Sequence, residues 1–182
     1  MDRTNFAYMT LGAFAPALQR IMDLKRLLGL RSPLHTVGRL LNPSRAPFTL
    51  SAVTHPPYLP LQQGASELLG QPRMATFKGE GGEAERRPEK ACDVHYLDQG
   101  RSGVEEWPAM IEGARPHAEV LDIGELGRIW SEDAADPAAL AAITGTMAIA
   151  LKYSGRATTQ DMAQGEAMKL WRNRPRDLRC FL

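Results

Sequence analysis

The sequence has few cysteines and no long apolar run. Its 182 residues include two cysteines, Cys92 and Cys180, which are far apart and have no CxxC or Cys/His spacing. This argues against a disulfide framework or a zinc site and fits a reduced compartment. The apolar stretch 6–18 is interrupted by polar residues and by a proline, and it is shorter than the about 20 residues that a membrane-spanning helix needs. We therefore expect a cytoplasmic protein without a membrane partner.

The sequence also lacks internal repeats, low-complexity segments and a large net charge. The formal net charge is +1, and 43% of the residues are hydrophobic, which is enough to bury a core at this length. Aromatic residues make up 7% and form no stripe that would stack nucleic-acid bases. These values predict one domain over residues 1–182.

The small net charge hides an uneven distribution along the chain. The segment 20–45 has net charge +5, with one acid, Asp23, whereas the segment 80–136 has fifteen acids and six cations, net −9. A basic face of this kind attracts phosphate backbones. The candidate nucleic-acid-binding residues are Arg20, Lys25, Arg26, Arg39 and Arg45.

Hydrophobic periodicity predicts alternating helices and strands. Such alternation is typical of an α/β domain with a mixed, mostly parallel sheet flanked by helices, in which ligands bind at the carboxyl ends of the strands. Asp136 and either Thr158 or Thr159 are predicted helix caps. The predicted helices are 16–29, 59–69, 137–153 and 159–171, and the predicted strands are 49–54, 73–77, 93–97 and 103–107.

Several short motifs, each present once, follow one another along the chain. They are Phe14-Ala-Pro-Ala-Leu, the run Leu28-Gly-Leu-Arg31 and its continuation to Leu40-Leu-Asn-Pro43, the turn Gly79-Glu-Gly-Gly, and the helix around 149–161. Together they resemble the catalytic α/β domain of the anthranilate phosphoribosyltransferase and nucleoside phosphorylase superfamily. The similarity is greatest to its divergent YbiB-like branch, which binds nucleic acid. Only the later part of that fold is covered, so we expect a C-terminal fragment of a longer family member, without the N-terminal helical domain.

The resemblance implies a reaction and a set of ligands. Family enzymes transfer phosphoribose from phosphoribosyl diphosphate to an amine or base, with Mg²⁺ bound to the diphosphate. The family's dimers form through the helical domain, so the resemblance offers a homodimer for the full-length protein and leaves the oligomeric state of this chain open.

Several positions that carry the family's chemistry hold other residues here. A pocket histidine is replaced by Ala15, and Lys25 replaces an arginine that binds the substrate carboxylate, keeping the charge but losing the two-pronged geometry. His35 replaces an asparagine, and Arg39 a proline. The residues that the resemblance offers for substrate or phosphate binding are Lys25, Arg31, His35, Arg39 and Asn42.

The family's metal-binding Asp-Glu pair aligns with Ala84-Glu85, so the first carboxylate is missing. Glu85, with Glu83 as a possible substitute, is a weak Mg²⁺ anchor because hard cations take several oxygen ligands. No catalytic residue is assigned.

Each candidate also has a structural interpretation. Lys25 and Arg39 fit solvated surface cations, and a lone histidine such as His35 more often has a structural role. Gly79–Gly82 fits a tight turn better than a phosphate cradle, because no Lys-Ser/Thr follows.

Two functions therefore remain open. One is a member without the standard activity that binds single- or double-stranded DNA through a basic cleft. The other is an active transferase that uses phosphoribosyl diphosphate and Mg²⁺ with an altered acceptor.

Overall fold

The computed structural model describes residues 7–30, 32–113, 123–131 and 136–177. The chain separates into two compact units, Met1–Ala46 (the first unit) and Pro47–Leu182 (the second unit). Arg31 and Cys180 lie outside the described residues. The single domain expected over 1–182 stays a prediction.

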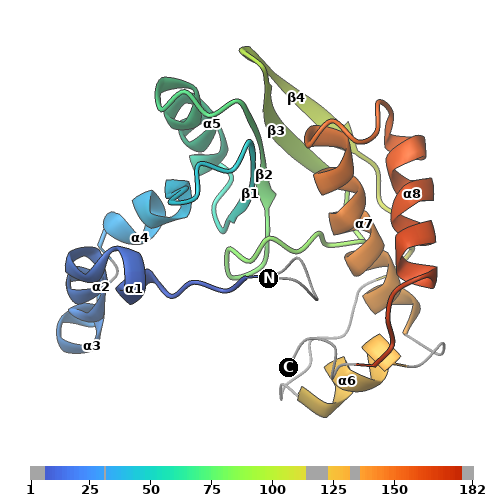
Figure 1. Ribbon diagram of the computed structural model, residues 1–182, viewed down its shortest axis with the longest axis horizontal. Coiled ribbons are helices and arrows are strands. Elements are labelled where there is room, and N and C mark those ends of the chain that lie inside the picture. The colour runs from blue at the N-terminus through green and yellow to red at the C-terminus, as the bar shows by residue number, and fades with distance from the viewer. Residues whose placement is uncertain (1–6, 31, 114–122, 132–135, 178–182) are drawn as a thin grey trace. The chain divides into compact units, whose positions relative to one another are not determined.

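The first unit is built from short helices (Figure 1). Pro16 occupies the first turn of α2, where its missing N–H costs nothing. The predicted helix 16–29 is interrupted at Leu24, which separates α2 from α3. No described side chain of this unit is buried. The helices are α1 (Leu11–Phe14), α2 (Pro16–Asp23), α3 (Lys25–Leu28), α4 (Leu34–Val37) and the 3-10 helix η1 (Gly38–Leu40).

The second unit is an α/β fold with a four-stranded mixed sheet in the order β1-β2-β3-β4. Its elements are β1 (Phe48–Val53), α5 (Tyr58–Leu68), β2 (Arg73–Lys78), β3 (Cys92–Asp98), β4 (Arg101–Trp107), α6 (Ile123–Ser131), α7 (Pro137–Tyr153) and α8 (Gln160–Arg172). β1 pairs in parallel with β2, as the crossover through α5 allows. The predicted α/β class with a mixed sheet is confirmed. Among the described strands, however, antiparallel pairs outnumber the parallel one, which differs from the mostly parallel sheet expected.

One of the two antiparallel pairs in the described sheet, β3–β4, is a tight hairpin. Gln99 and Gly100, the two turn residues, both have positive φ, 49° and 85°. This conformation suits a two-residue hairpin turn because its twist matches that of the strands. Asp98 and Arg101, which flank the turn, are the last pair of residues in the register of the two strands.

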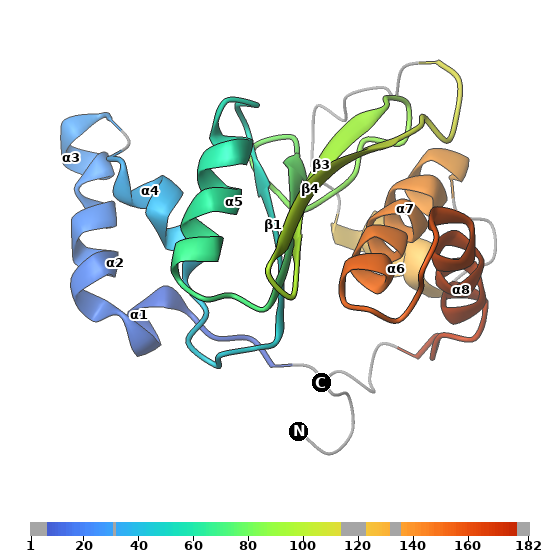
Figure 2. The ribbon, with the colours of Figure 1, turned by 90° about the horizontal axis from the view of Figure 1, so that it is seen from above.

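Helices cover both faces of the sheet. Figure 2 shows α5 on one side of the strands and α7 with α8 on the other. α7 has alanine, glycine and threonine on several sides, so it packs closely against both β2 and α8. The cap residues of α7 and α8 behave as predicted: Asp136 accepts a hydrogen bond from the Ala138 N–H, and Thr159 from that of Met162. Each such cap contributes about 1 kcal/mol.

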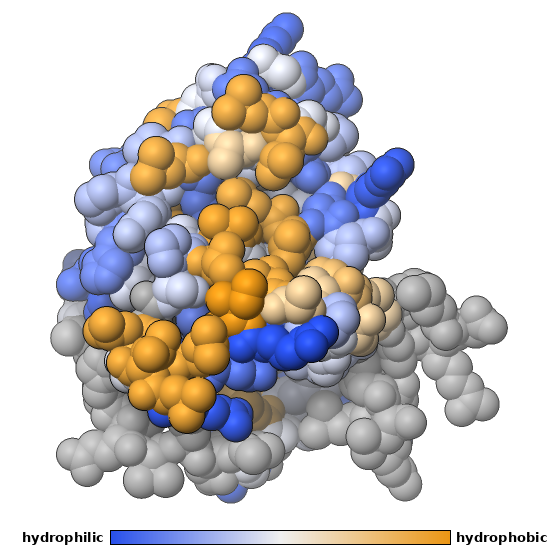
Figure 3. Space-filling view, turned by 90° about the vertical axis from the view of Figure 1, so that its left-hand side faces the viewer, coloured by the Kyte–Doolittle hydropathy of each residue, from blue (hydrophilic) through white to orange (hydrophobic). Residues whose placement is uncertain are grey.

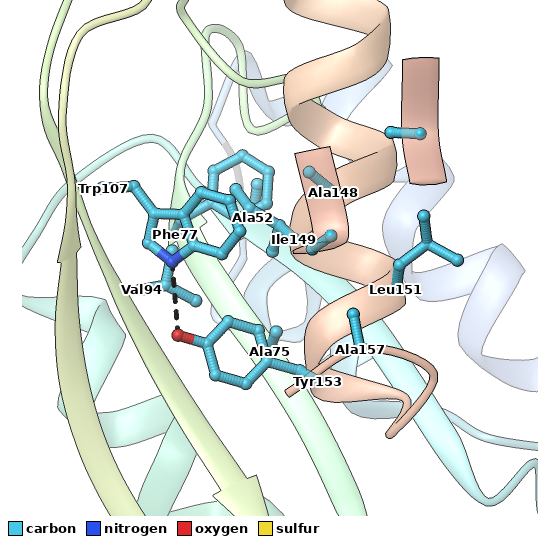
Figure 4. Close-up of a cluster of buried hydrophobic side chains, with 12 residues drawn as sticks. Ala52, Ala75, Phe77, Val94, Trp107, Ala148, Ile149, Leu151, Tyr153 and Ala157 are labelled. Carbon is cyan, nitrogen blue, oxygen red and sulfur yellow. Dashed lines mark hydrogen bonds between the residues drawn. The ribbon is translucent and has the colours of Figure 1, made fainter. Parts of the chain in front are cut away.

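The core lies between the sheet and α7 (Figure 4). Phe77 and Val94 of the strands meet Ala148 and Ile149 of α7, and all four are almost fully buried. Trp107 is buried at the end of β4, and its indole N–H donates to the Tyr153 hydroxyl at 3.3 Å. Burying such aromatic rings with their polar atoms bonded gives the second unit a defined core.

Candidate nucleic-acid interface

The candidate cations lie in the first unit. Arg20 is in α2, Lys25 and Arg26 open α3, Arg39 is in η1, and Arg45 follows in a turn. Lys25 and Arg26 are adjacent in the sequence, and both are exposed.

Three of these five cations form no ion pair with a residue that the structure describes. Within the described part of the chain, Lys25, Arg26 and Arg45 form no ion pair. The Arg20 Nε contacts the Pro16 carbonyl at 3.5 Å, and Arg39 is half-buried. Exposed cations without a counter-charge keep their full attraction for an external anion, subject to screening by salt.

Asn42 has a structural role in the turn before β1. Its side chain accepts from the Ala46 N–H and donates to the Ala46 carbonyl, both at 2.8 Å. The Arg45 N–H donates to the Asn42 carbonyl at 3.0 Å, and Arg45 has a positive φ of 49°. The Asn42 amide is thus engaged with the backbone and presents Arg45 on a tight turn.

His35 also has a local partner. Its Nδ1 lies 3.3 Å from the Ser32 hydroxyl and 3.2 Å from the Ser32 carbonyl, within the turn that leads into α4. Of the substrate-binding candidates, Lys25 is the most exposed, while His35, Arg39 and Asn42 are half-buried and Arg31 lies outside the described residues.

The two carboxylates of the metal motif lie in the second unit, on the turn after β2. Gly79 begins this turn, and its N–H donates to the Val53 carbonyl at 3.0 Å, which joins the turn to the end of β1. A Cβ at this position would lie 1.8 Å from the Glu83 carbonyl oxygen, so only glycine fits. Glu83 and Glu85 are both exposed. Among the residues that the structure describes, no group of three or more metal-ligating side chains is close enough to hold a cation. Two exposed carboxylates do not make a Mg²⁺ site by themselves.

Arg86, which the sequence analysis did not single out, fixes this turn against α7. Only 2% of Arg86 is exposed, its backbone N–H donates to the Thr146 hydroxyl at 2.9 Å, and its guanidinium donates to the Pro108 carbonyl. The guanidinium also lies over the Trp107 ring, 5.3 Å from its centroid. Burial lowers the pKa of Arg86 and raises that of the neighbouring Cys92 thiol. Nothing in the pattern Glu-Arg-Arg-Pro distinguishes this buried arginine from the half-buried Arg87.

A second polar cluster joins β4 to α7 and α8. Glu105 accepts from Lys152, from the Tyr153 hydroxyl at 2.5 Å and from Gln160 at 3.0 Å. Burial acts to raise the pKa of Glu105, but these hydrogen bonds hold it below its ordinary value. Burial, together with the bond to Glu105, raises the pKa of Tyr153. All of these groups are engaged with one another, so the cluster is structural.

The second unit is an α/β fold with a glycine-rich acidic turn after its parallel strand pair, and comparison with known proteins shows what it resembles. No family model matches the chain. Curated relatives do match the chain. It is 28% identical over 115 residues to the anthranilate phosphoribosyltransferase of Ignicoccus hospitalis, and the match covers 63% of this chain and 34% of that protein. It is 33% identical over 99 residues to the anthranilate phosphoribosyltransferase of Nitratidesulfovibrio vulgaris, covering 54% of this chain and 29% of that one.

An uncharacterized protein of Escherichia coli, YbiB, is 26% identical over 102 residues, covering 54% of this chain and 31% of YbiB. The predicted resemblance to the anthranilate phosphoribosyltransferase superfamily is thereby confirmed, and YbiB fits its divergent branch. The chain spans about a third of the length of the curated relatives it matches. In the described residues, no helix is long and apolar enough to cross a membrane.

Proposed function

We propose that this anthranilate phosphoribosyltransferase-like protein binds nucleic acid through the exposed cations of its first unit and lacks the standard transferase activity. The observation that carries the proposal is that Lys25, Arg26 and Arg45 are exposed and form no ion pair in the described part of the chain. The replaced family positions Ala15 and Ala84 support it, because each removes a polar or charged contact to the substrate or metal.

The charges make the proposal quantitative. Each phosphate that a cation neutralises releases a counterion, so the logarithm of the binding constant falls with the logarithm of salt concentration by about 0.7 per contact on a single strand and about 0.9 on a duplex. With Arg20, Lys25, Arg26 and Arg45 engaged, the slope on single-stranded DNA is about −3.

The test is fluorescence anisotropy with labelled single- and double-stranded DNA over a series from about 50 to about 200 mM salt. Replacing Lys25, Arg26 and Arg45 together by alanine reduces the slope to about −1. The matched control replaces Lys90, Arg101 and Arg172, three exposed cations of the second unit, and leaves the slope unchanged. No binding at low salt, or an equal loss in both triple variants, refutes the proposal.

A second candidate function, transfer from phosphoribosyl diphosphate to an altered acceptor, is favoured by the matched relatives that are named anthranilate phosphoribosyltransferase. In this case Lys25 and Arg39 are candidates for phosphate contacts, and Glu83 and Glu85 can only supplement a Mg²⁺ ion that the diphosphate itself carries. Calorimetry with phosphoribosyl diphosphate and Mg²⁺ tests this candidate. Saturable heat that Glu83→Gln with Glu85→Gln weakens supports it, and no heat refutes it.

A further inference from the structure

Arg86 of the second unit lies inside the protein without a compensating charge. Hydrophilic side chains lie at the surface of the face that Figure 3 displays, whereas only 2% of Arg86 is exposed. It forms no ion pair with a carboxylate among the described residues, and its Nε has no hydrogen-bond partner there. Burying a cation costs free energy unless an anion and hydrogen-bond acceptors compensate it. The surroundings of Arg86 therefore lack one anion and one acceptor.

The fold makes room for this side chain. Gly145 of α7 lies against it, and a Cβ at Gly145 would come within 3.0 Å of the Arg86 Cδ. The guanidinium also lies over the Trp107 ring, 5.3 Å from its centroid, and donates to the Pro108 carbonyl. These contacts fix the position of Arg86, but none of them supplies a negative charge.

The Cys92 thiol is the group beside Arg86 that can become negative. Cys92 opens β3 directly opposite Trp107 in the register, and its side chain packs against the core that contains Trp107. Arg86 and Cys92 interact through their charges and through a side-chain hydrogen bond. Cys92 is only half-buried, so a small reagent needs little opening of the fold to reach it.

The thiol does not supply the missing charge at neutral pH. Burial raises the pKa of Cys92, and the neighbouring Asp93 acts in the same direction, while Arg86 acts to lower it. Near pH 7 the thiol is therefore mostly protonated. An oxidised sulfur is different, because a sulfinate is an anion at neutral pH and its oxygens accept hydrogen bonds.

We propose that Cys92 is a site of oxidation by hydrogen peroxide and that Arg86 holds the sulfinate that forms. In each of two steps the sulfur attacks a peroxide oxygen, an S–O bond forms as the O–O bond breaks, and the sulfur loses two electrons. The first step converts the thiol and peroxide to a sulfenic acid and water. The second converts the sulfenic acid and another peroxide to a sulfinate, water and a proton, which goes to solvent. The sulfinate then pairs with the guanidinium and accepts from the Arg86 Nε.

This oxidation site is separate from the proposed function, because neither Cys92 nor Arg86 belongs to the candidate nucleic-acid interface. A protein that binds no DNA but oxidises at Cys92 supports this inference and refutes only the proposed function. A protein that binds DNA and resists oxidation at Cys92 does the reverse.

Substitution by a carboxylate tests the pairing without any oxidant. Aspartate has two oxygens and one negative charge, as a sulfinate has, and asparagine has the same shape without the charge. At pH 7 we expect Cys92→Asp to resist urea better than Cys92→Asn while Arg86 is present. In an Arg86→Met background the order reverses, because the carboxylate is then buried alone. An order that stays the same without Arg86 overturns the pairing. If Arg86→Met does not fold, a more stable Cys92→Asn in the unaltered background overturns it instead.

Mass spectrometry of the whole chain treated with hydrogen peroxide tests the oxidation. Cys180→Ser leaves Cys92 as the only cysteine, and Met162, which is 58% exposed, reports general oxidation in the same sample. We expect Cys92 to gain two oxygen atoms, at a rate that rises with pH because the thiolate is the reacting form. Oxidation of Met162 without oxidation of Cys92 overturns the inference.

Variants of the neighbouring arginines show whether the guanidinium takes part. Arg86→Met slows the oxidation of Cys92 about tenfold at pH 7, because the cation that favours the thiolate is gone, and Arg86→Lys, which keeps the charge, retains most of the rate. Arg87→Met, at a half-buried arginine that pairs with Glu89, is the matched control and leaves the rate unchanged. Circular dichroism confirms that each variant keeps its fold. Equal rates in the Arg86 and Arg87 variants overturn the role of Arg86.

Discussion

Arg86 is a buried cation that pairs with no carboxylate among the described residues and is held by the Pro108 carbonyl and the face of Trp107. Sequence reasoning treats an arginine in a charged stretch as solvated, because arginines are rarely fully buried. Only the packing of the turn on α7 shows that this residue is inside. Lys25 is the opposite case: it is exposed, as expected of a solvated surface cation, and it lies in a four-residue helix, α3, that has no buried residue.

His95 gives a pH-dependent prediction. Burial lowers its pKa from 6.5, against a smaller opposing effect of Asp93, and its Nδ1 lies 3.2 Å from the Gln63 side-chain oxygen. The unfolded chain therefore takes up a proton near pH 6.5 while the folded chain does not, so stability is lost as the pH falls from 6.5 towards the folded pKa.

Chemical denaturation at a series of pH values tests this prediction. His95→Gln keeps a polar group beside Gln63 but cannot be protonated, so its stability falls less over that pH interval than that of the unaltered protein. His55→Gln, at an exposed histidine, is the control. Parallel curves for the unaltered protein and His95→Gln would show that burial of His95 has no such effect.

At the scale of elements, the turn after β2 depends on Gly79. Replacing it with alanine drives a Cβ into the Glu83 carbonyl oxygen, which is backbone and cannot move aside without breaking the turn. We expect Gly79→Ala to lower the free energy of unfolding by about 2 kcal/mol or more. Gly64→Ala is the matched control, because its Cβ meets nothing within 4 Å and helical alanine is favoured by about 0.8 kcal/mol. The steric argument would be contradicted if urea denaturation gave Gly79→Ala and the unaltered protein the same free energy of unfolding.

The elements of the second unit were largely predictable. α7, α8 and the β3–β4 hairpin have strong local signals, namely caps, continuous apolar helix faces and turn residues, and the structure places their boundaries within about two residues of the prediction, as is usual at helix ends. The helix 16–29 was predicted as one piece but divides at Leu24, since its apolar residues find no buried face that would hold it straight. α6 and α4 were missed, because a nine-residue and a four-residue helix carry too few periodic positions to be recognised.

At the scale of the whole molecule, the two units differ in how much they bury. The second unit has a continuous core, whereas no described side chain of the first unit is buried. Short helices without burial are marginal in water. We therefore expect residues 47–182 to melt cooperatively and a peptide of residues 1–46 to show little helix.

Circular dichroism with thermal melting of both pieces checks this expectation. Adding trifluoroethanol to the peptide is the control, since it should restore helix if the sequence is competent to form one. A cooperative melt of the isolated peptide would contradict the prediction. The composition could not reveal this contrast, because the helices of the first unit contain as many leucines as a buried helix would.

The two outer strands of the described sheet differ in a way that bears on recovery from unfolding. β4 carries Arg101, Glu105 and Glu106, and such charges discourage other strands from adding to an edge. β1, with the sequence Phe-Thr-Leu-Ser-Ala-Val, has no charge, proline or glycine in its six residues. A segment of this composition is the kind that stacks into intermolecular cross-β structure when it is released. Reversible refolding of this protein therefore requires β1 to pair with β2 before it pairs with a strand of a second chain. The dependence of the refolding yield on protein concentration should arise mainly from these six residues.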